Sequence, residues 1–496
     1  MYLLGCDIGC SAVKVSIVEA ESGKTVGSDF FPKAEAPIKA AHPGWAEQNP
    51  DDWWLYVSKA IRGALGKSGI KGEDIAAIGL AYQMHGLVVV DKNKTVLRPS
   101  IIWCDSRAVS YGDCAFHAIG EKRCLYHLLN SPGNFTASKL AWVKEYEPQL
   151  YRSIYKIMLP GDYIAMRMTG EIATTVPGLS EGIFWDFQEN AISDDVLSYF
   201  GFEKDLIPDI CPTFGVQGEL LGSVAAELGL KKGTPVTYRA GDQSNNALSL
   251  NVLNPGEIAA TAGTSGVVYG VNDKLNYDVL SRVNTFAHVN HTREHPRLGT
   301  LLCINGVGIL NSWIKKTIAP EGTSYEQLNR LAESVPIGSE GISILPFGNG
   351  AERMLENKQV DCAFFGINFN IHGKAHLARA AQEGVVFSFK YGMDIMNEMG
   401  LDIQVIRAGN SNMFLSELFK EALACVTGTV IEVFDTNGAV GAAKGAGIGA
   451  GIYSTFEEAF ASLKRIEVVE PDGLKANRYC GAFDCWKERL EKMIGG

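Results

Sequence analysis

The sequence predicts an α/β protein of two domains, each with its own sheet and helices. Strand-like apolar runs are interleaved with helical patterns along the 496 residues, which is typical of α/β folds. A strand, a small-residue turn and a second strand at residues 3–18 recur at residues 258–269, and Asn254-Pro255-Gly256 between them is the strongest linker signal in the chain. We therefore expect one domain over residues 1–253 and a second, of related build, over residues 254–496.

The composition is that of a folded, acidic protein. Hydrophobic residues make up 46% of the chain, and the formal net charge is −11 without any run of more than two Lys or Arg. Such a chain lacks the basic clusters that bind nucleic acid or anionic membranes, so we expect neither as a partner. The eleven cysteines form no CxxC pair, which favours reduced thiols. Because Asp7 comes too early for a signal peptide and no apolar stretch reaches membrane-spanning length, we expect a cytoplasmic protein.

The first predicted strand ends in a turn of small residues that follows Asp7, and Val13–Val18 alternates as the second strand. Gly9 and Ser11 can offer backbone N–H groups to a phosphate, and Lys14 adds a cation. The carboxylate of Asp7 can hold a metal ion or its water shell. An ordinary Asp-x-Gly hairpin explains the same residues, and on this stretch alone it is the better explanation.

A helix is predicted to begin at Pro50. Asn49 is a good N-cap residue, Pro50 suits the first helical position, and Asp51 and Asp52 place negative charge in the first turn. The helical pattern continues to about Leu65.

The next strand, Ile75–Leu80, leads into the polar bend Gln83-Met84-His85, and a second apolar strand follows at Leu87–Val90. Polar side chains confined to a bend between two apolar strands are hard to explain by packing, so Gln83 and His85 are candidates for binding a polar ligand. A buried histidine with an internal partner is an equally good explanation.

The most informative stretch runs from Pro235 to Leu250. An apolar run bends at Gly241, presents the carboxylate of Asp242, and continues with helical spacing. In an open α/β sheet, ligands bind beyond the carboxyl ends of strands, which is where this acid is predicted to lie. On this stretch alone, a helix N-cap is the better explanation of Asp242.

The second half contains two turns suited to a nucleotide. The turn Gly263-Thr264-Ser265-Gly266 lies between two predicted strands, where small residues can bind phosphate, although a tight hairpin also selects glycine. Residues Ile403–Ile406 form a strand that opens into Gly409 and Asn412 before a helix from about Phe414. Glycine lets the backbone approach a flat ring or a phosphate, and Asn412 can hydrogen-bond to it; a helix cap is the alternative.

Two further helices are predicted in this half. Ala378–Met399 has the pattern of one long amphipathic helix. Residues 437–451 have glycines at helical spacing, each costing about 1 kcal/mol against alanine, which implies close packing of the helix backbone against a neighbour. This stretch is neither a Walker loop nor a dinucleotide-binding fingerprint.

Taken together and in this order, these motifs resemble the FGGY carbohydrate kinases, and within them the members that phosphorylate xylulose. The matching stretches span nearly the whole chain, whereas each is weak alone. They are Asp7-x-Gly9 with Lys14, Gly44–Pro50, Gln83–Gly86, Thr136–Trp142, Gly241-Asp242, Gly263–Gly266, Asn284–His288 and the glycine-rich helix near the C-terminus.

The resemblance implies two actin-like (RNase H-like) α/β domains with a catalytic cleft between them, and an enzyme that uses ATP and Mg²⁺. It implies phosphorylation of a small sugar, with D-xylulose giving D-xylulose 5-phosphate as the expected reaction. The N-terminal domain would bind the sugar and supply the catalytic base, and the C-terminal domain would bind the nucleotide. Whether the chain forms a homodimer is left open.

The resemblance also assigns roles to residues. Asp242 matches the catalytic base of the family. Asp7 matches the catalytic carboxylate that organises Mg²⁺ through water. Sugar contacts are implied for Met84, His85, Asp242 and Gln243, the last standing where these enzymes usually have Asn. Nucleotide contacts are implied for Gly9, Ser11, Lys14, Gly263, Thr264, Gly409 and Asn412.

The chain departs from the family pattern at several positions that bear on phosphate and nucleotide binding. Cys10 stands where Thr is common, and Arg239 and Ala240 stand where the family has glycines before Gly241. Ala408 replaces a glycine near adenine. In the signature around Lys139, Asn134 replaces the usual residue.

Other functions are also compatible with parts of the sequence. A kinase for ribulose, fuculose, gluconate or glycerol would share most of these residues. An actin-like ATPase could use the same two phosphate turns, but it would not need Gln83-Met84-His85 beside an acid. A catalytically idle sugar-binding regulator is the third alternative, suggested by Cys10 and Arg239.

Overall fold

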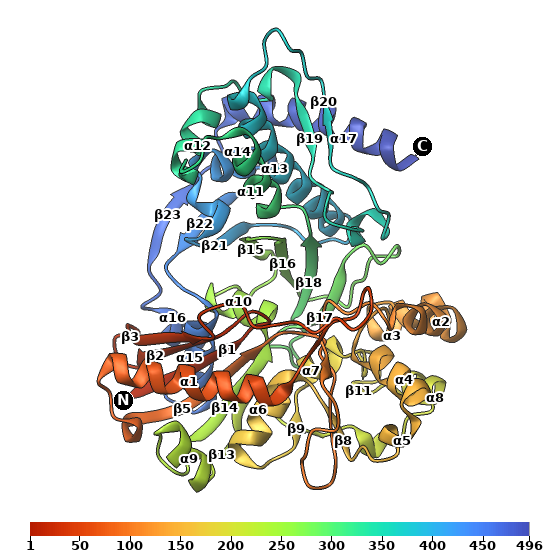
Figure 1. Cartoon of the computed structure of the whole chain (residues 1–496), viewed down its shortest axis with the longest axis vertical. Coiled ribbons are helices and arrows are strands. Elements are labelled where there is room, and N and C mark those ends of the chain that lie inside the picture. The colour runs from red at the N-terminus through yellow and green to blue at the C-terminus, as the bar shows by residue number, and fades with distance from the viewer. Residues whose placement is uncertain (496) are drawn as a thin grey trace. The chain divides into compact units, whose positions relative to one another are not determined.

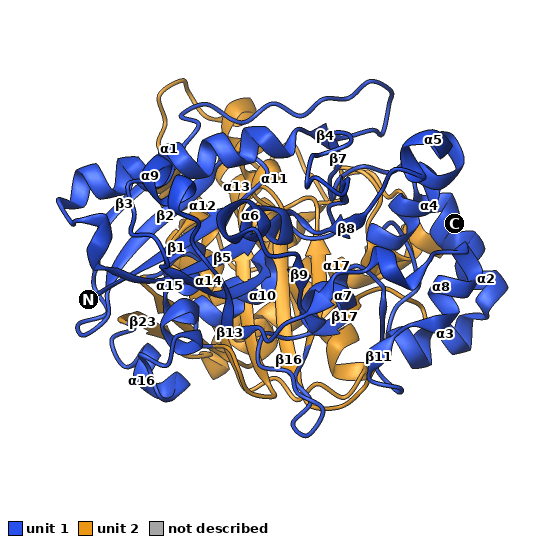
Figure 2. Ribbon diagram, turned by 90° about the horizontal axis from the view of Figure 1, so that it is seen from below, with its two compact units in different colours: residues 1–251, 286–298, 436–463 blue, residues 252–285, 299–435, 464–496 orange. Residues whose placement is uncertain are grey.

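The computed structural model describes residues 1–495, which form two compact units. Unit 1 comprises residues 1–251, 286–298 and 436–463, and unit 2 comprises residues 252–285, 299–435 and 464–496 (Figure 2). The chain first passes from one unit to the other at residues 251 and 252, close to the predicted linker.

Unit 1 is built on a six-stranded sheet of order β13-β14-β5-β1-β2-β3 (Figure 1). The strands are β1 (Tyr2–Ile8), β2 (Val13–Glu19), β3 (Thr25–Phe31), β5 (Ile75–Tyr82), β13 (Phe214–Glu219) and β14 (Pro235–Gly241). β1 pairs antiparallel with β2 and parallel with β5, which in turn is parallel to β14. The carboxyl ends of β1, β5 and β14 therefore lie at the same edge of the sheet.

Helix α1 (Pro50–Ser68) forms as its sequence predicts. The Asn49 side chain accepts a hydrogen bond from the Asp51 N–H at 3.3 Å, and the helix ends in a left-handed Gly69. Its buried face, which includes Trp53 and Val57, belongs to the hydrophobic core of the unit 1 sheet. The helix runs three residues beyond the predicted end at Leu65.

The glycine-rich helix α15 (Gly438–Gly449) packs directly against the sheet of unit 1. A Cβ atom at Gly449 would lie 1.9 Å from the carbonyl oxygen of Thr237 in β14, and one at Gly445 would lie 2.7 Å from the Tyr238 ring. The Thr237 hydroxyl donates to the Ala446 carbonyl at 2.8 Å. The close backbone packing predicted from the glycines is thus confirmed.

This packing also explains why the units are not continuous in sequence. Residues 436–463, which include α15, belong to unit 1, as do residues 286–298. The continuous division into residues 1–253 and 254–496 differs from the observed units in these two segments.

Unit 2 repeats the strand order of unit 1. Its seven-stranded sheet has the order β17-β18-β16-β15-β21-β22-β23. The strands are β15 (Glu257–Ala262), β16 (Gly266–Asn272), β17 (Asn284–Ala287), β18 (Leu298–Ile304), β21 (Val405–Gly409), β22 (Val430–Phe434) and β23 (Arg465–Val469). β15 pairs antiparallel with β16 and parallel with β21, as β1 does with β2 and β5. The two domains of related build predicted from the recurring hairpin are confirmed.

The remaining elements surround these two sheets. The other helices of unit 1 are α2 (Val109–Ile119), α3 (Glu121–Leu128), α4 (Thr136–Tyr146), α5 (Pro148–Tyr151), α6 (Pro160–Thr169), α7 (Val176–Glu181), α8 (Asp194–Phe200), α9 (Gly222–Leu228), α10 (Asp242–Ser249) and α16 (Phe456–Phe460). Those of unit 2 are α11 (Gly308–Ile318), α12 (Tyr325–Glu333), α13 (Lys374–Glu398), α14 (Glu417–Thr427) and α17 (Gly473–Gly495).

Short strands and 3₁₀ turns connect them. The strands are β4 (Glu47–Gln48), β6 (Val88–Val90), β7 (Ser100–Ile101), β8 (Lys156–Met158), β9 (Ala173–Thr174), β10 (Trp185–Asp186), β11 (Ala191–Ile192), β12 (Asp209–Ile210), β19 (Ser343–Leu345) and β20 (Ala363–Phe365). The 3₁₀ turns are Gly72–Asp74, Lys204–Leu206, Ser339–Gly341, Arg353–Leu355 and Asn412–Leu415.

Two predicted helix starts in unit 2 are corrected. The helix expected from about Phe414 begins at Glu417, because Asn412–Leu415 forms a 3₁₀ turn and the Ser416 side chain caps the helix by accepting from the Phe419 N–H. The helix expected from Ala378 begins at Lys374. Within residues 1–495, none of the helices combines the length and apolar character needed to cross a membrane.

Candidate active site

Three parallel strands of unit 1 end side by side and bring the predicted sugar-side residues to one edge of the sheet. Ile8 at the end of β1 is in register with Tyr82 of β5, and Tyr82 is in register with Gly241 of β14. The segments that follow these ends carry the residues identified in the sequence, which are Gly9, Cys10, Ser11, Gln83, Met84, His85 and Asp242. Ligands of open α/β sheets bind at such an edge.

Asp242 is the first residue of helix α10, directly after strand β14. The N-cap position belongs to Gly241, which has no capping side chain, so the N-cap explanation of Asp242 is wrong. A Cβ atom at Gly241 would lie 2.4 Å from Oε2 of Glu181 and 2.7 Å from Cγ of Met84. The turn therefore requires glycine, and it places Asp242 next to these two side chains.

The carboxyl group of Asp242 is half-buried and its pKa is raised above the ordinary value of an aspartate. Its pKa is raised to about 7, first by burial and second by the negative charge of Asp7, while hydrogen bonds from the backbone and side chain of Gln243 oppose the shift. Near neutral pH the group therefore exchanges readily between its ionised and protonated forms. Such a carboxylate is suited to accept a proton during a reaction.

Glu181 is a second acid of this site that the sequence reasoning missed. Its side chain is buried, and burial together with the charges of Asp242 and Asp162 holds its pKa well above the usual range. The Tyr82 side chain hydrogen-bonds to it. One signal was available: Glu181 is the single charged residue between Val176 and Trp185.

His85 occupies a strained bend that several contacts hold in place. Its φ is 62°, its Nδ1 lies 2.9 Å from the Glu181 carbonyl oxygen, and its own carbonyl accepts from Nζ of Lys139 at 2.7 Å. Because Nδ1 faces a carbonyl oxygen, it carries a proton. The rings of Phe135 and Phe286 pack on His85 at centroid distances of 4.7 and 5.4 Å.

Lys139 and Gln83 support this bend from the interior. Lys139 is fully buried, and burial lowers its pKa to about 7. Gln83 is also buried; its backbone N–H donates to the Ile8 carbonyl at 2.8 Å and its amide donates to Gln48 Oε1 at 3.0 Å. The structure thus places Gln83 under the bend, which favours a supporting role over the ligand contact suggested by the sequence.

The turn after β1 adds the residues implied for phosphate and metal binding. The Gly9 N–H donates to the Ala12 carbonyl at 3.1 Å, and Ser11 lies exposed at the tip. Lys14 is opposite Asp7 in the β1–β2 register. Burial raises the pKa of Asp7, and the charge of Lys14 opposes that shift.

The residues present fit the Mg²⁺ that the family implies. Asp7 and Asp242 lie close enough that the charge of Asp7 raises the pKa of Asp242, and a divalent cation near them would relieve this repulsion. Within residues 1–495 no cluster of three or more acidic, histidine or cysteine side chains forms a complete metal site. Mg²⁺ is commonly held by one or two carboxylates together with water and substrate phosphates, which agrees with this sparse set.

Arg239, a departure from the family pattern, has a structural explanation. Its guanidinium is buried and lies 3.1 Å from Oδ1 of Asp162, and it donates to the Ala173 carbonyl at 3.0 Å. Asp162 in turn accepts from the Leu159 N–H at the start of α6. Arg239 therefore neutralises a buried acid beneath the sheet edge.

A pocket of about 710 Å³ in unit 2 is lined by three of the predicted nucleotide-side residues, Gly263, Thr264 and Asn412. Gly263 and Thr264 at the end of β15, Gly308 and Ile309 at the start of α11, and Asn412 line it. The Asn412 Nδ2 atom lies 3.7 Å from the position of a Cβ on Gly263, so the two predicted segments meet here. The volume is typical of pockets that bind small molecules and cofactors.

Gly409 is outside the set of residues that line this pocket. It is the last residue of β21 and precedes the segment that carries Asn412, whose φ is 54°. The structure therefore brings Gly263, Thr264 and Asn412 together in the pocket, whereas Gly409 lies at the end of β21 and does not line it.

A buried hydrogen-bond network on one side of the pocket was not predicted. The Gln382 amide donates to Asn329 Oδ1 at 2.9 Å and accepts from the Ser416 hydroxyl at 2.7 Å. These residues come from α13, α12 and the turn before α14, and all three line the pocket.

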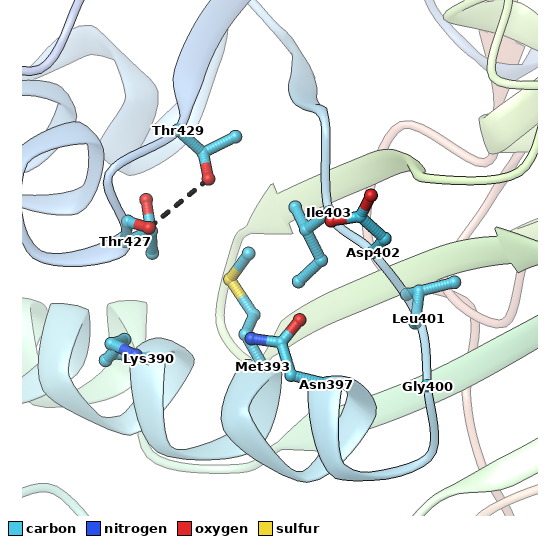
Figure 3. A pocket seen from close by; sticks show the side chains of 9 residues that line it. All are labelled: Lys390, Met393, Asn397, Gly400, Leu401, Asp402, Ile403, Thr427 and Thr429. Carbon is cyan, nitrogen blue, oxygen red and sulfur yellow. Dashed lines mark hydrogen bonds between the residues drawn. The ribbon is translucent and has the colours of Figure 1, made fainter.

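A second cavity in unit 2, of about 460 Å³, lies at the opposite ends of the strands. Figure 3 shows Lys390, Met393 and Asn397 of α13 on one side and Thr427 and Thr429 on the other. It is also lined by residues 400–403, just before β21 begins, whereas the nucleotide-side pocket lies beyond the carboxyl end of that strand. None of the predicted site residues lines this cavity.

Comparisons with known proteins identify the family of the chain. Residues 2–249 match the N-terminal domain of the FGGY family of carbohydrate kinases, and residues 258–450 match its C-terminal domain. The chain is 30% identical to the xylulose kinase of Escherichia coli strain K12, with 99% of this chain and 98% of that protein covered. It is 29% identical to the L-xylulose/3-keto-L-gulonate kinase of the same strain, with 100% and 97% covered.

The fold is also found in a solved structure. The crystal structure of xylulose kinase from Rhodospirillum rubrum superposes with a TM-score of 0.89 at 24% identity, and each chain is covered completely. Both family domains, full-length similarity to sugar kinases and the shared two-domain fold lead to one conclusion: the chain belongs to the FGGY family of carbohydrate kinases.

Proposed function

We propose that this kinase transfers the γ-phosphate of ATP to D-xylulose, giving D-xylulose 5-phosphate, with Asp242 as the general base. The observation that carries the proposal is the position of Asp242 at the head of α10, half-buried beside Met84 and Glu181, with a pKa raised to about 7 by burial. Both relatives described above are named for kinases that act on a xylulose.

Asp242 would accept the proton of the attacking sugar hydroxyl. In phosphoryl transfer this proton becomes more acidic as the bond to phosphorus forms, so a carboxylate with a pKa near 7 can orient the hydroxyl and take the proton late. Gln243, which hydrogen-bonds to Asp242, would fix the carboxylate, and Met84 and His85 would contact the sugar. Mg²⁺, held by Asp7 through water, would supply charge neutralisation on the phosphates.

The nucleotide is assigned to the pocket of unit 2. Backbone N–H groups of the turn after β15, with Thr264, would hold the terminal phosphates, as would the turn at Gly9 and Ser11 with Lys14. Asn412 and the segment after Gly409 would contact adenine. These assignments give unit 1 the sugar and unit 2 the nucleotide.

A neutral sugar suits the site better than a sugar acid. The charged groups that act on Asp242 and Glu181 include other carboxyl groups, Asp7 and Asp162 among them. Lys139, whose Nζ donates to the His85 carbonyl, is fully buried. A substrate carboxylate would meet like charge here, which favours a pentulose over gluconate or 3-keto-L-gulonate.

Transfer in a single step also requires the γ-phosphate to reach the sugar hydroxyl. We therefore propose that Asn254-Pro255-Gly256 serves as a hinge and that binding both substrates closes the enzyme. Small-angle scattering with D-xylulose and a non-hydrolysable ATP analogue should show a smaller radius of gyration than the free protein. An unchanged radius would refute the closure.

The test of function is a coupled assay for ADP release with ATP and a panel of acceptors. D-xylulose should give the highest kcat/KM, above L-xylulose, D-ribulose, L-fuculose, D-gluconate and glycerol, and ADP release without sugar should be slow. A faster reaction with another acceptor would change the substrate assignment. ATP hydrolysis that no sugar stimulates would instead support an actin-like ATPase, and tight sugar binding without turnover would support a regulator.

A further inference from the structure

The pocket of unit 2 depends on a connection that joins β18 to α11. The Gly308 N–H donates to the Gly263 carbonyl at 2.8 Å, and the Ile309 N–H donates to the Thr264 carbonyl at 3.1 Å. A Cβ atom at Gly308 would lie only 2.3 Å from the Gly263 carbonyl oxygen. The turn that bears Gly263 and Thr264 is thus held by residues 308 and 309.

A buried acid holds the other end of this connection. Glu352 has no exposed surface, and the Asn305 N–H donates to its Oε1 at 2.9 Å and its Oε2 at 3.2 Å. The Gly306 N–H also donates to the carboxylate. The Asn305 side chain donates to the Ala351 carbonyl at 2.9 Å, so the segments around residues 305 and 352 are joined twice.

The connection cannot easily adjust if this acid is removed. A Cβ atom at Gly306 would lie 1.5 Å from the Pro346 carbonyl oxygen, so the backbone here is already in close contact with the neighbouring segment. In the part of the chain that the structure describes, Glu352 is in no ion pair, and its bonds are to backbone N–H groups. An unpaired buried carboxylate is costly for stability, which makes a purely structural purpose a poor explanation.

We propose that Glu352 is a positioning residue for the nucleotide: by binding the N–H groups of Asn305 and Gly306 it fixes the connection whose far end aligns Gly263 and Thr264. The inference rests on the proposed function, because it takes the unit 2 pocket as the nucleotide site. Glu352 itself is not among the residues that line the pocket. Its effect therefore passes through the backbone of residues 305–309.

The test compares Glu352→Gln, Glu352→Asp and the unaltered enzyme. Glu352→Gln replaces one acceptor oxygen by an amide NH₂ group, which would face the backbone N–H donors of Asn305 and Gly306. Because the connection would then lose its fixed position, ADP binding should weaken by roughly 10- to 100-fold. The KM for ATP should rise by the same factor, while the KM for the sugar stays within about twofold. Glu352→Asp keeps the charge, so it should recover part of the ADP affinity. ADP affinity is measured by isothermal titration calorimetry without sugar.

Glu383→Gln in α13 is the matched control. Glu383 is also buried and accepts from a backbone N–H, that of Gly338 at 3.1 Å, but it pairs with Arg379 and makes no bond to residues 305–309. It should lower the melting temperature and leave ADP affinity within about twofold.

The outcomes separate the two proposals. If Glu352→Gln lowers the melting temperature as Glu383→Gln does while ADP affinity is unchanged, Glu352 is merely structural and the inference is overturned; should that variant not fold, Glu352→Asp decides in the same way. An enzyme that binds ADP but phosphorylates no sugar refutes the proposed function and leaves this comparison intact. An unaltered enzyme that does not bind ADP overturns the inference as well.

Discussion

The two candidate sites share a sheet topology but differ in the kind of side chain they use. In unit 1 the edge of the sheet carries acids, Asp7, Asp242 and Glu181, whose pKa values burial raises. In unit 2 the corresponding edge forms a pocket lined mainly by glycine, hydroxyl and amide groups such as Gly263 and Thr264. On the function proposed above, proton chemistry would belong to unit 1, whereas unit 2 would bind its ligand mainly by backbone and polar contacts.

The largest expected effect is on the acid at the centre of this contrast. Asp242→Asn should lower kcat by roughly 10²- to 10⁴-fold, the usual contribution of a general base, while the dissociation constant for D-xylulose changes little. Steady-state kinetics and calorimetry measure the two quantities. Asp194→Asn is the matched control, because Asp194 is also the first residue of a unit 1 helix but is exposed, and it should leave kcat unchanged. Near-normal turnover by Asp242→Asn would refute the general-base assignment.

The same substitution should stabilise the fold above pH 7. The folded-state pKa of Asp242 is raised from 3.8 to about 7, so the folded state holds this proton more tightly than the unfolded state, and stability falls as pH rises across that interval. At pH 8 the ionised group costs up to about 4 kcal/mol, at 1.36 kcal/mol per pKa unit, and asparagine removes this cost. A higher melting temperature for Asp242→Asn at pH 8 than for the unaltered protein is the expected result.

An intermediate effect is expected from Gly308→Ala in unit 2, and it should concern nucleotide binding alone. Gly308→Ala places a Cβ 2.3 Å from the Gly263 carbonyl oxygen, so the turn with Gly263 and Thr264 must move. The KM for ATP should rise by roughly 10- to 100-fold with little change in the KM for the sugar, since a displacement of about 1 Å costs on this order. Gly373→Ala is the control, because a Cβ there meets no atom within 4 Å. Equal effects on the KM for ATP and the KM for the sugar would contradict the proposal that unit 1 binds the sugar and unit 2 binds the nucleotide.

The sequence revealed features that depend on near neighbours along the chain. The strand–turn–helix around Gly241, the capped helix after Asn49 and the glycine-rich helix α15 all follow from local spacing, and each forms in the structure. The identity of the family also followed from the order of such motifs. Boundaries were less accurate, as at the helix that begins at Glu417 instead of Phe414.

Other features depend on contacts that spacing does not reveal. Glu181 lies 61 positions before Asp242, and only the packing of α7 against the end of β14 makes them neighbours. Arg239 departs from the family pattern in sequence, and its purpose requires knowing that Asp162 is buried beside it. Buried polar pairs of this kind follow from tertiary packing, which a single sequence leaves open.

The smallest expected effect concerns pH and would sharpen the assignment of charge to unit 1. The general base must be ionised to act, so kcat/KM should rise with pH through an apparent pKa of about 7 and level off above it. The negative charge of Asp7 is the second cause of that raised pKa, after burial. Asp7→Asn should therefore shift the acidic limb of the profile to lower pH, in addition to any loss of rate from weaker Mg²⁺ binding.

The direction of this shift distinguishes the roles of the two acids. Gly308→Ala, which alters only the unit 2 pocket, should lower kcat/KM for ATP at every pH without moving the limb, so it serves as the control. A limb that stays in place in Asp7→Asn would mean that Asp7 does not act on the group that titrates. A limb that moves to higher pH would contradict the assignment of Asp242 as that group, because removing a neighbouring negative charge can only favour the ionised carboxylate.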